Sequence, residues 1–224
     1  LKMAEIFSGL MDKTDVPYDL HLFQALGYTN LETAVETLIL ENFDLVLYSQ
    51  VWEYGGFGEG QGFINALVSR ATSRGILWMN AAGNFAKSTF MSRVERGADD
   101  WALLPGPYQS IQIRCYRNET GFCPIRLVLA WNSFSDAVNQ GTDKDLDLVL
   151  SDDTLTVLKT GGLVQKRPIV PGTRGVSIYP REIVEPKLKP GLYFARVKIR
   201  SSNFTASDRL RLTVSGTSVE LLNK

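Results

Sequence analysis

Residues 73–84 read Ser-Arg-Gly-Ile-Leu-Trp-Met-Asn-Ala-Ala-Gly-Asn, and the apolar run at 76–81 predicts a strand that ends in small residues. Small residues let a neighbouring backbone or a substrate approach closely. Asn84 follows the carboxyl end of this strand, where its carboxamide could donate a hydrogen bond to a developing oxyanion. The alternative is that Asn84 only turns the chain after the strand.

Residues 18–81 alternate between short apolar runs and amphipathic helix patterns. Asn30 is a credible N-cap for the first helix, and Gly75 is positioned to end the second. This order implies right-handed crossovers and an α/β fold, a parallel, doubly wound βαβαβ unit. The predicted elements are strands at 18–23, 43–48 and 76–81, helices at 30–41 and 63–73, and a loop with five glycines at 53–62.

From about residue 108 the pattern changes to short alternating runs separated by Gly, Pro, Asn and Asp. This period of two, without helix patterns, predicts an antiparallel β-sandwich. We therefore expect two domains, an α/β domain at 1–100 and a sandwich at 101–224, with the boundary inside 86–107. The expected sandwich core comprises Ile113, Leu127, Leu129, Leu148, Val197 and Leu212.

Composition excludes several classes of function. Among the 224 residues, 24 Lys and Arg balance 24 Asp and Glu, so no nucleic-acid partner is indicated. No apolar run reaches membrane-spanning length. Cys115 and Cys123 flank a turn-rich segment and form either a hairpin disulfide, suited to an oxidising compartment, or a reduced pair. Because the sequence opens on Leu1, we also expect a processed or excised piece.

With the helix before it, the 73–84 stretch resembles the oxyanion-hole segment of subtilisin-like serine proteases (subtilases), which carries A-A-G-N. The resemblance covers roughly residues 16–90. It implies that Asn84 donates to the oxyanion during hydrolysis of a peptide or protein substrate. The segment at 49–56 is longer and more aromatic than the family pattern, so a plain surface loop is the alternative there. The substrate-binding residues implied are Ser49, Gly55, Gly56, Ala82 and Gly83.

The catalytic triad of that family is not found in a workable context. His21, the single histidine, lies in the first predicted strand and is expected to be a core or sheet-face histidine. Ser218 follows Gly-Thr as in the family's nucleophile motif, but the buried helix that should begin there is missing. The resemblance therefore implies that the triad lies before residue 1 and after Lys224, in the remainder of the protease domain. We expect this chain alone to be inactive, and to require no cofactor.

The acidic run Asp143, Asp145 and Asp147 precedes a strand and suggests a weak structural Ca²⁺ site, the alternative being solvated turn acids. Residues 127–150 resemble the jelly-roll domains found with secreted subtilases, which implies a secreted or extracellular protein, in the periplasm or at the cell surface. Two other functions stay open. One is an inactive, peptide-binding protease relative, and the other is a carbohydrate-binding or adhesion module carried by the sandwich.

Overall fold

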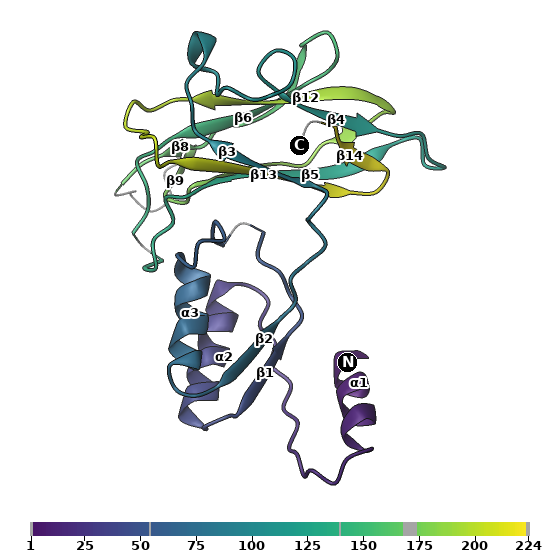
Figure 1. Cartoon of the computed structure of the whole chain (residues 1–224), viewed down its shortest axis with the longest axis vertical. Helices are drawn as coiled ribbons and strands as arrows, with labels where there is room; N and C mark the ends of the chain where they lie inside the picture. The colour runs from purple at the N-terminus through teal and green to yellow at the C-terminus, as the bar shows by residue number, and fades with distance from the viewer. Residues whose placement is uncertain (1, 54, 139, 168–173, 223–224) are drawn as a thin grey trace.

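The computed structural model describes residues 2–53, 55–138, 140–167 and 174–222. Leu1, Lys224 and Tyr54 of the glycine-rich segment lie outside this range. Two helices and a small parallel sheet form one part of the molecule, and antiparallel sheets form the other (Figure 1). In the described residues, no helix has the length and apolar character to cross a membrane.

The α/β part contains the helices α2 (Tyr28–Leu40) and α3 (Phe63–Thr72) and the strands β1 (Leu45–Tyr48) and β2 (Leu77–Asn80). The two strands are parallel, with Tyr48 opposite Asn80 at their carboxyl ends. Both helices are amphipathic and bury apolar stripes in one shared core. These stripes are Leu31, Ala34, Val35 and Leu38 on α2, and Phe63, Ile64, Leu67 and Ala71 on α3.

The helix ends match the sequence prediction at one position and not at the other. Gly75 has φ +90°, and its N–H bonds to the carbonyl of Thr72 at 3.0 Å. The next N–H, of Ile76, bonds to Ala71 at 3.4 Å, so α3 ends in a Schellman motif with Gly75 in the left-handed position. Asn30, however, lies inside α2, whose N-cap is Gly27. The Asn30 amide donates to the carbonyl of Leu26 instead.

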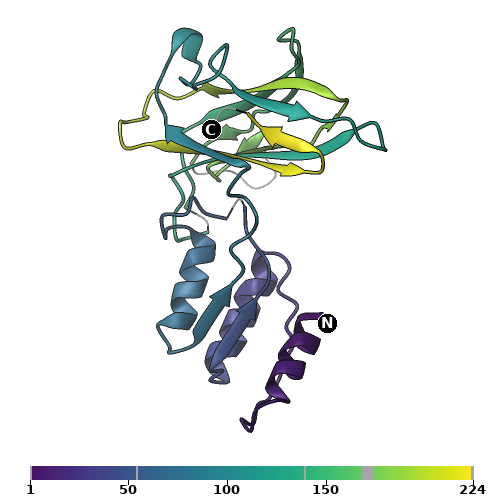
Figure 2. The ribbon, with the colours of Figure 1, turned by 45° about the vertical axis from the view of Figure 1, so that its right-hand side comes forward.

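The predicted first strand at 18–23 is wrong, so the described parallel sheet has two strands and not three. His21 and Phe23 place their rings against Phe43, with centroids 4.9 and 5.6 Å away. Phe43 lies before β1, and these contacts hold the segment there without pairing it along the edge of β1. Leu22 is 66% exposed. The preceding helix α1 (Lys2–Met11) buries none of its residues and stands apart from the sheet (Figures 1 and 2).

Two antiparallel sheets packed face to face form the sandwich. The first sheet has the strand order β10-β5-β13-β3, with β11 also paired to β5, and the second has the order β14-β4-β12-β6-β7. The first contains β3 (Thr89–Arg93), β5 (Cys123–Trp131), β10 (Arg181–Val184), β11 (Lys187–Leu188) and β13 (Arg209–Gly216). The second contains β4 (Ile111–Cys115), β6 (Leu146–Ser151), β7 (Val157–Gly161), β12 (Gly191–Ile199) and β14 (Val219–Leu221).

Smaller elements connect these sheets. A 3₁₀ turn, η1 (Ala98–Asp100), precedes β4, and the short strands β8 (Val164–Gln165) and β9 (Val176–Ser177) pair in parallel beside the sandwich. Because β3 already pairs with β13, the antiparallel part begins at Thr89, which lies inside the expected boundary segment 86–107 and before residue 101.

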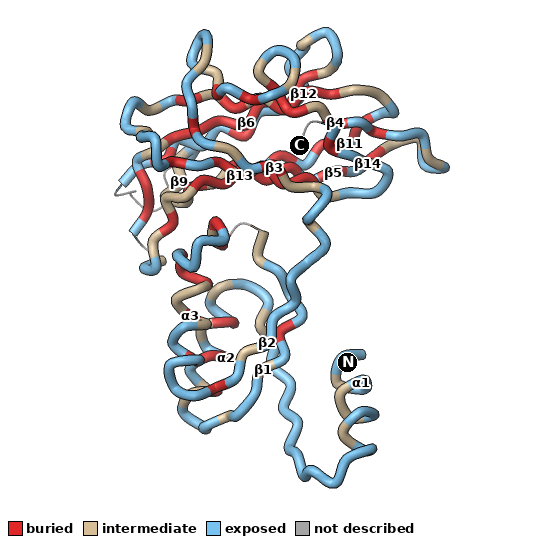
Figure 3. The backbone as a smooth tube through the Cα atoms, in the orientation of Figure 1, coloured by how far each residue is buried: buried red, intermediate tan, exposed pale blue. Residues whose placement is uncertain are grey.

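The core between the two sheets confirms the predicted inward positions (Figure 3). All six predicted residues, Ile113, Leu127, Leu129, Leu148, Val197 and Leu212, are almost fully buried. Cys115 and Cys123 form a disulfide. It joins β4 to β5, which belong to different sheets, so of the two alternatives the pair is bridged, but the bridge links two sheets and not the two strands of a hairpin.

Candidate functional site

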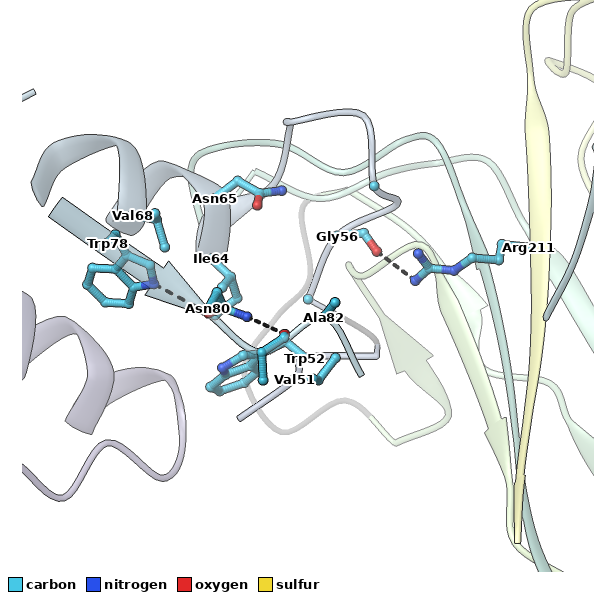
Figure 4. Close-up of a pocket in the computed structure, with 13 residues that line it drawn as sticks. Val51, Trp52, Gly56, Ile64, Asn65, Val68, Trp78, Asn80, Ala82 and Arg211 are labelled. Carbon is cyan, nitrogen blue, oxygen red and sulfur yellow. Dashed lines mark hydrogen bonds between the residues drawn. The ribbon is translucent and has the colours of Figure 1, made fainter. Parts of the chain in front are cut away.

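A pocket of about 360 Å³ opens at the carboxyl ends of β1 and β2, between the α/β part and the sandwich (Figure 4). In open α/β sheets this edge is where ligands bind. Its lining combines apolar and aromatic side chains with two amides and one guanidinium. The lining residues are Val51, Trp52, Gly55, Gly56, Gly58, Ile64, Asn65, Val68, Trp78, Asn80, Ala81, Ala82 and Arg211.

The described part of the glycine-rich loop, Glu53 and residues 55–62, forms one wall of this pocket because it lies directly against the start of α3. A side chain at Gly55 would place its Cβ 2.6 Å from Cγ1 of Ile64. Gly62 has φ +118°, and a Cβ there would come within 2.9 Å of the carbonyl oxygen of Gly55. Glycine is therefore required at both positions for the loop to fold back onto the helix.

Asn80, at the end of β2, links the segments that follow β1 and β2. Its amide donates to the carbonyl of Ala81 at 2.7 Å and to that of Gln50 at 3.4 Å. Its oxygen accepts the indole N–H of Trp78 at 3.3 Å. The sequence pattern gave no prediction for this residue, although it lies within residues 73–84, four positions before Asn84. Its position could have identified it, because Asn80 is the last residue of a strand that ends at a ligand-binding edge of the sheet.

The aromatic side chains of the pocket are also held by hydrogen bonds. The indole N–H of Trp52 donates to the hydroxyl of Tyr48 at 2.7 Å. Burial raises the pKa of that Tyr48 hydroxyl from its ordinary value, and the hydrogen bond from Trp52 acts in the opposite direction. The ring of Tyr48 in turn packs against Trp78, with centroids 5.6 Å apart. The aromatic wall is thus a connected unit built from both strands.

Arg211 reaches the pocket from β13 of the sandwich. It is the single charged side chain among the lining residues that the structure describes. Its guanidinium donates to the carbonyls of Phe57, Glu53 and Gly56 at 3.0, 2.8 and 3.0 Å. Burial lowers the pKa of Arg211, and the charge of nearby Glu53 acts in the opposite direction. A residue of the second half of the chain therefore touches the glycine-rich wall.

The structure brings some of the predicted substrate-binding residues together. Gly55, Gly56 and Ala82 line the pocket, whereas Ser49 and Gly83 are exposed beside it and are not part of its lining. Asn84 is exposed in a bend beyond the end of β2. Its exposure at the carboxyl end of a strand agrees with the sequence prediction, and its oxyanion role stays a prediction.

His21 and Ser218 lie in separate regions, and neither lines the pocket. His21 contacts Asp19 at 3.1 Å in the irregular segment before α2. Ser218 occupies the turn between β13 and β14, where its carbonyl accepts the N–H of Tyr116 at 2.8 Å. The described lining contains no Ser, Cys, His, Asp or Glu side chain. It offers groups that bind, but no nucleophile or base.

The three acids of the predicted Ca²⁺ site do not form a ligand set. Asp143 contacts Arg167 at 3.6 Å, and Asp147 is paired with Arg200. Within the described ranges, no group of three or more acidic, His or Cys side chains could hold a metal ion. Asp145 is buried, and burial together with the Asp147 charge raises its pKa to about 6.

No protein-family model and no curated protein matches the sequence. Among solved structures, the chain matches the crystal structure of the infectious bursal disease virus VP2 subviral particle with a TM-score of 0.22 and 12% identity. The match covers 62% of this chain and 30% of that chain. A likeness this weak carries no argument about fold or function.

Proposed function

We propose that this chain is the central part of a subtilisin-like serine endopeptidase, in which the pocket binds a side chain of a peptide substrate. The observation that carries the proposal is the position of Gly55, Gly56 and Ala82. These residues, implied by the resemblance to contact substrate, come from two separated segments and meet in one pocket at the carboxyl edge of a parallel sheet.

In this proposal Asn84 donates to the oxyanion of the tetrahedral intermediate, while the nucleophile, base and acid belong to polypeptide outside this chain. The exposed face of the parallel sheet supports such a partner. Leu77 is 61% exposed and Met79 54%, whereas both faces of parallel sheets are normally covered. The remainder of a protease domain would cover this face. The sandwich would then correspond to the jelly-roll domain of secreted subtilases.

A secreted or extracellular location belongs to the same proposal. Disulfides persist in oxidising compartments and are rare in the cytosol. The Cys115–Cys123 disulfide, buried between the two sheets, supports this location.

A second candidate function is peptide binding without catalysis. It is favoured by the absence of a nucleophile or base from the described lining of the pocket. Both functions require the pocket to bind peptide, and they differ in whether a longer protein that contains this chain cleaves it.

A pocket-filling substitution tests the shared requirement. Binding of blocked tetrapeptides, Ac-Ala-Ala-Ala-X-amide with X as Phe, Leu or Glu, is followed by the fluorescence of Trp52 and Trp78, which line the pocket. Ala82→Phe should abolish the fluorescence change. Ala206→Phe, in an exposed loop between β12 and β13, is the matched control and should leave it intact. Equal binding by wild type and Ala82→Phe would refute the site.

A further inference from the structure

We propose that Arg211 is a positioning residue, through which the sandwich holds the wall of the pocket in its peptide-binding shape. This inference rests on the proposed peptide-binding function, and it assigns the second half of the chain a part in that function. Arg211 acts through the backbone carbonyls of Glu53, Gly56 and Phe57, to which its guanidinium donates hydrogen bonds.

The position of Arg211 follows from the strand pattern of β13. Leu210 and Leu212 point into the core between the two sheets, and Arg211 between them points to the opposite face. That face is turned toward the α/β part, and Figure 4 shows the guanidinium directed at the carbonyl of Gly56. The backbone of Arg211 is fixed on both sides, opposite Ala130 of β5 and Met91 of β3. The guanidinium therefore projects from a rigid support.

The chemistry of the contact explains why arginine is suited to this position. A guanidinium offers five N–H donors in a rigid planar fork, whereas a lysine ammonium is a compact charge on a flexible stem. Three carbonyls from a stretch of five residues converge on this fork. Hydrogen bonds from a charged donor are stronger than neutral ones, especially where water is partly excluded.

The wall needs such support because of its composition. Gly55 and Gly56 have few steric limits on their backbone, so the loop gains little rigidity from its own residues. Two further side chains of the sandwich contact the described part of the loop: Asp136 accepts the N–H of Gly62 at the end of the loop, and Arg209 meets Glu59 at 3.5 Å. Both partners of this pair are roughly half exposed, and exposed ion pairs contribute little. Arg209, on the same strand, is thus a matched control for Arg211.

The test measures peptide affinity and loop opening in parallel, on the whole chain. With the same blocked tetrapeptides as probes, Arg211→Met should raise Kd by roughly tenfold or more, equivalent to losing one or two hydrogen bonds. Arg211→Lys should give an intermediate Kd, and Arg209→Met should stay near wild type. Amide hydrogen exchange at residues 55–57 should accelerate in Arg211→Met, while exchange in β5 and β12 stays slow.

The outcomes separate this inference from the proposed function. If wild type binds none of the peptides, the proposed function fails, and exchange at 55–57 alone decides whether Arg211 holds the loop. If Arg211→Met and Arg211→Lys keep the wild-type Kd and wild-type exchange, the positioning role is refuted. Equal weakening by Arg209→Met would also refute it, because the effect would then follow loss of charge on this face and not the three carbonyl contacts.

Discussion

The carboxylate of Asp136 accepts a hydrogen bond from the backbone N–H of Gly62 at 2.8 Å, across 74 positions of the chain. Gly62 is the N-cap of α3 and has no side chain to satisfy the first N–H groups of that helix. A loop of the sandwich thus supplies a negative charge at the positive end of α3, where carboxylates are stabilising. The two parts of the molecule are therefore coupled at the base of the glycine-rich loop.

Removing this acceptor should destabilise the start of α3. Asp136→Ala should lower the free energy of unfolding by about 1 kcal/mol, the usual effect of losing a helix cap. Asp136→Asn keeps an acceptor oxygen and should cost less, which makes it the matched control. Urea denaturation followed by circular dichroism measures both. Identical stabilities for wild type and Asp136→Ala would show that the contact contributes nothing.

Glu182 should make stability depend on pH. Burial raises its pKa from 4.5 to about 7, and the nearby Asp145 and Asp147 charges act in the same direction. Because the folded-state pKa lies above the unfolded value, the native state binds the proton more tightly. The contribution of Glu182 to the free energy of unfolding is therefore fully present below about pH 4.5 and is lost as the pH rises to about 7. Asp145, with its pKa near 6, should add to this loss.

Glu182→Gln should remove much of this pH dependence and stabilise the protein above pH 7. The amide oxygen can still accept the bonds that the carboxylate receives from Leu163 N–H, at 2.9 Å, and from Gln165, at 2.7 Å. Glu119→Gln, at an exposed position in the β4–β5 connection, is the control. Thermal unfolding across the pH range provides the measurement. A wild type that gains stability as the pH rises from about 4.5 to 7 would contradict the prediction.

The sandwich should fold without the α/β part. Its core lies between its own two sheets and includes Leu127, Leu129 and Leu148, all fully buried. A fragment of residues 88–222 should show one cooperative thermal transition, and Leu129→Ala should lower its stability by about 2–5 kcal/mol. A fragment that melts without cooperativity would mean that the sandwich depends on the α/β part.

Catalysis should depend on Asn84 in a longer protein that supplies the triad. Asn84→Ala should lower kcat by about 10²–10³-fold with little change in KM, because the carboxamide would meet the oxyanion only in the transition state. His21→Ala and Ser218→Ala should leave hydrolysis intact, since both residues lie away from the pocket. If either of these abolished hydrolysis and Asn84→Ala did not, the active site would be elsewhere.

Much of the fold could be predicted because it follows from local periodicity. Alternation along β5 and β13 places Leu129 and Leu212 inward. Helix α3 ends where it was predicted to end, because Gly75 adopts the left-handed backbone conformation that ends a helix. The failed prediction at 18–23 has a physical cause. An apolar run indicates that a segment contacts other residues, but pairing along a strand edge depends on distant parts of the chain. Here ring contacts with Phe43 replace that pairing.

The candidate site could be predicted only in part for the same reason. Gly55, Gly56 and Ala82 followed from motifs within short segments. Arg211 alternates with buried leucines, so the sequence places it on the outer face of a strand, where an arginine is unremarkable. Its contacts with the glycine-rich loop arise because the α/β part packs against that face, and they join residues 154 or more positions apart. Asp136 was missed in the same way.

Amide chemical-shift mapping tests the central claim most directly. Titrating the labelled chain with Ac-Ala-Ala-Ala-Phe-amide should shift the backbone amides of Val51, Gly55, Gly56, Ala81 and Ala82, which line the pocket. The amides of β4 and β6, in the other sheet of the sandwich, should stay unchanged. Shifts at the pocket that saturate with peptide are the result that this account predicts. Shifts confined to the sandwich, or none at millimolar peptide, would contradict a peptide-binding site at the carboxyl ends of β1 and β2.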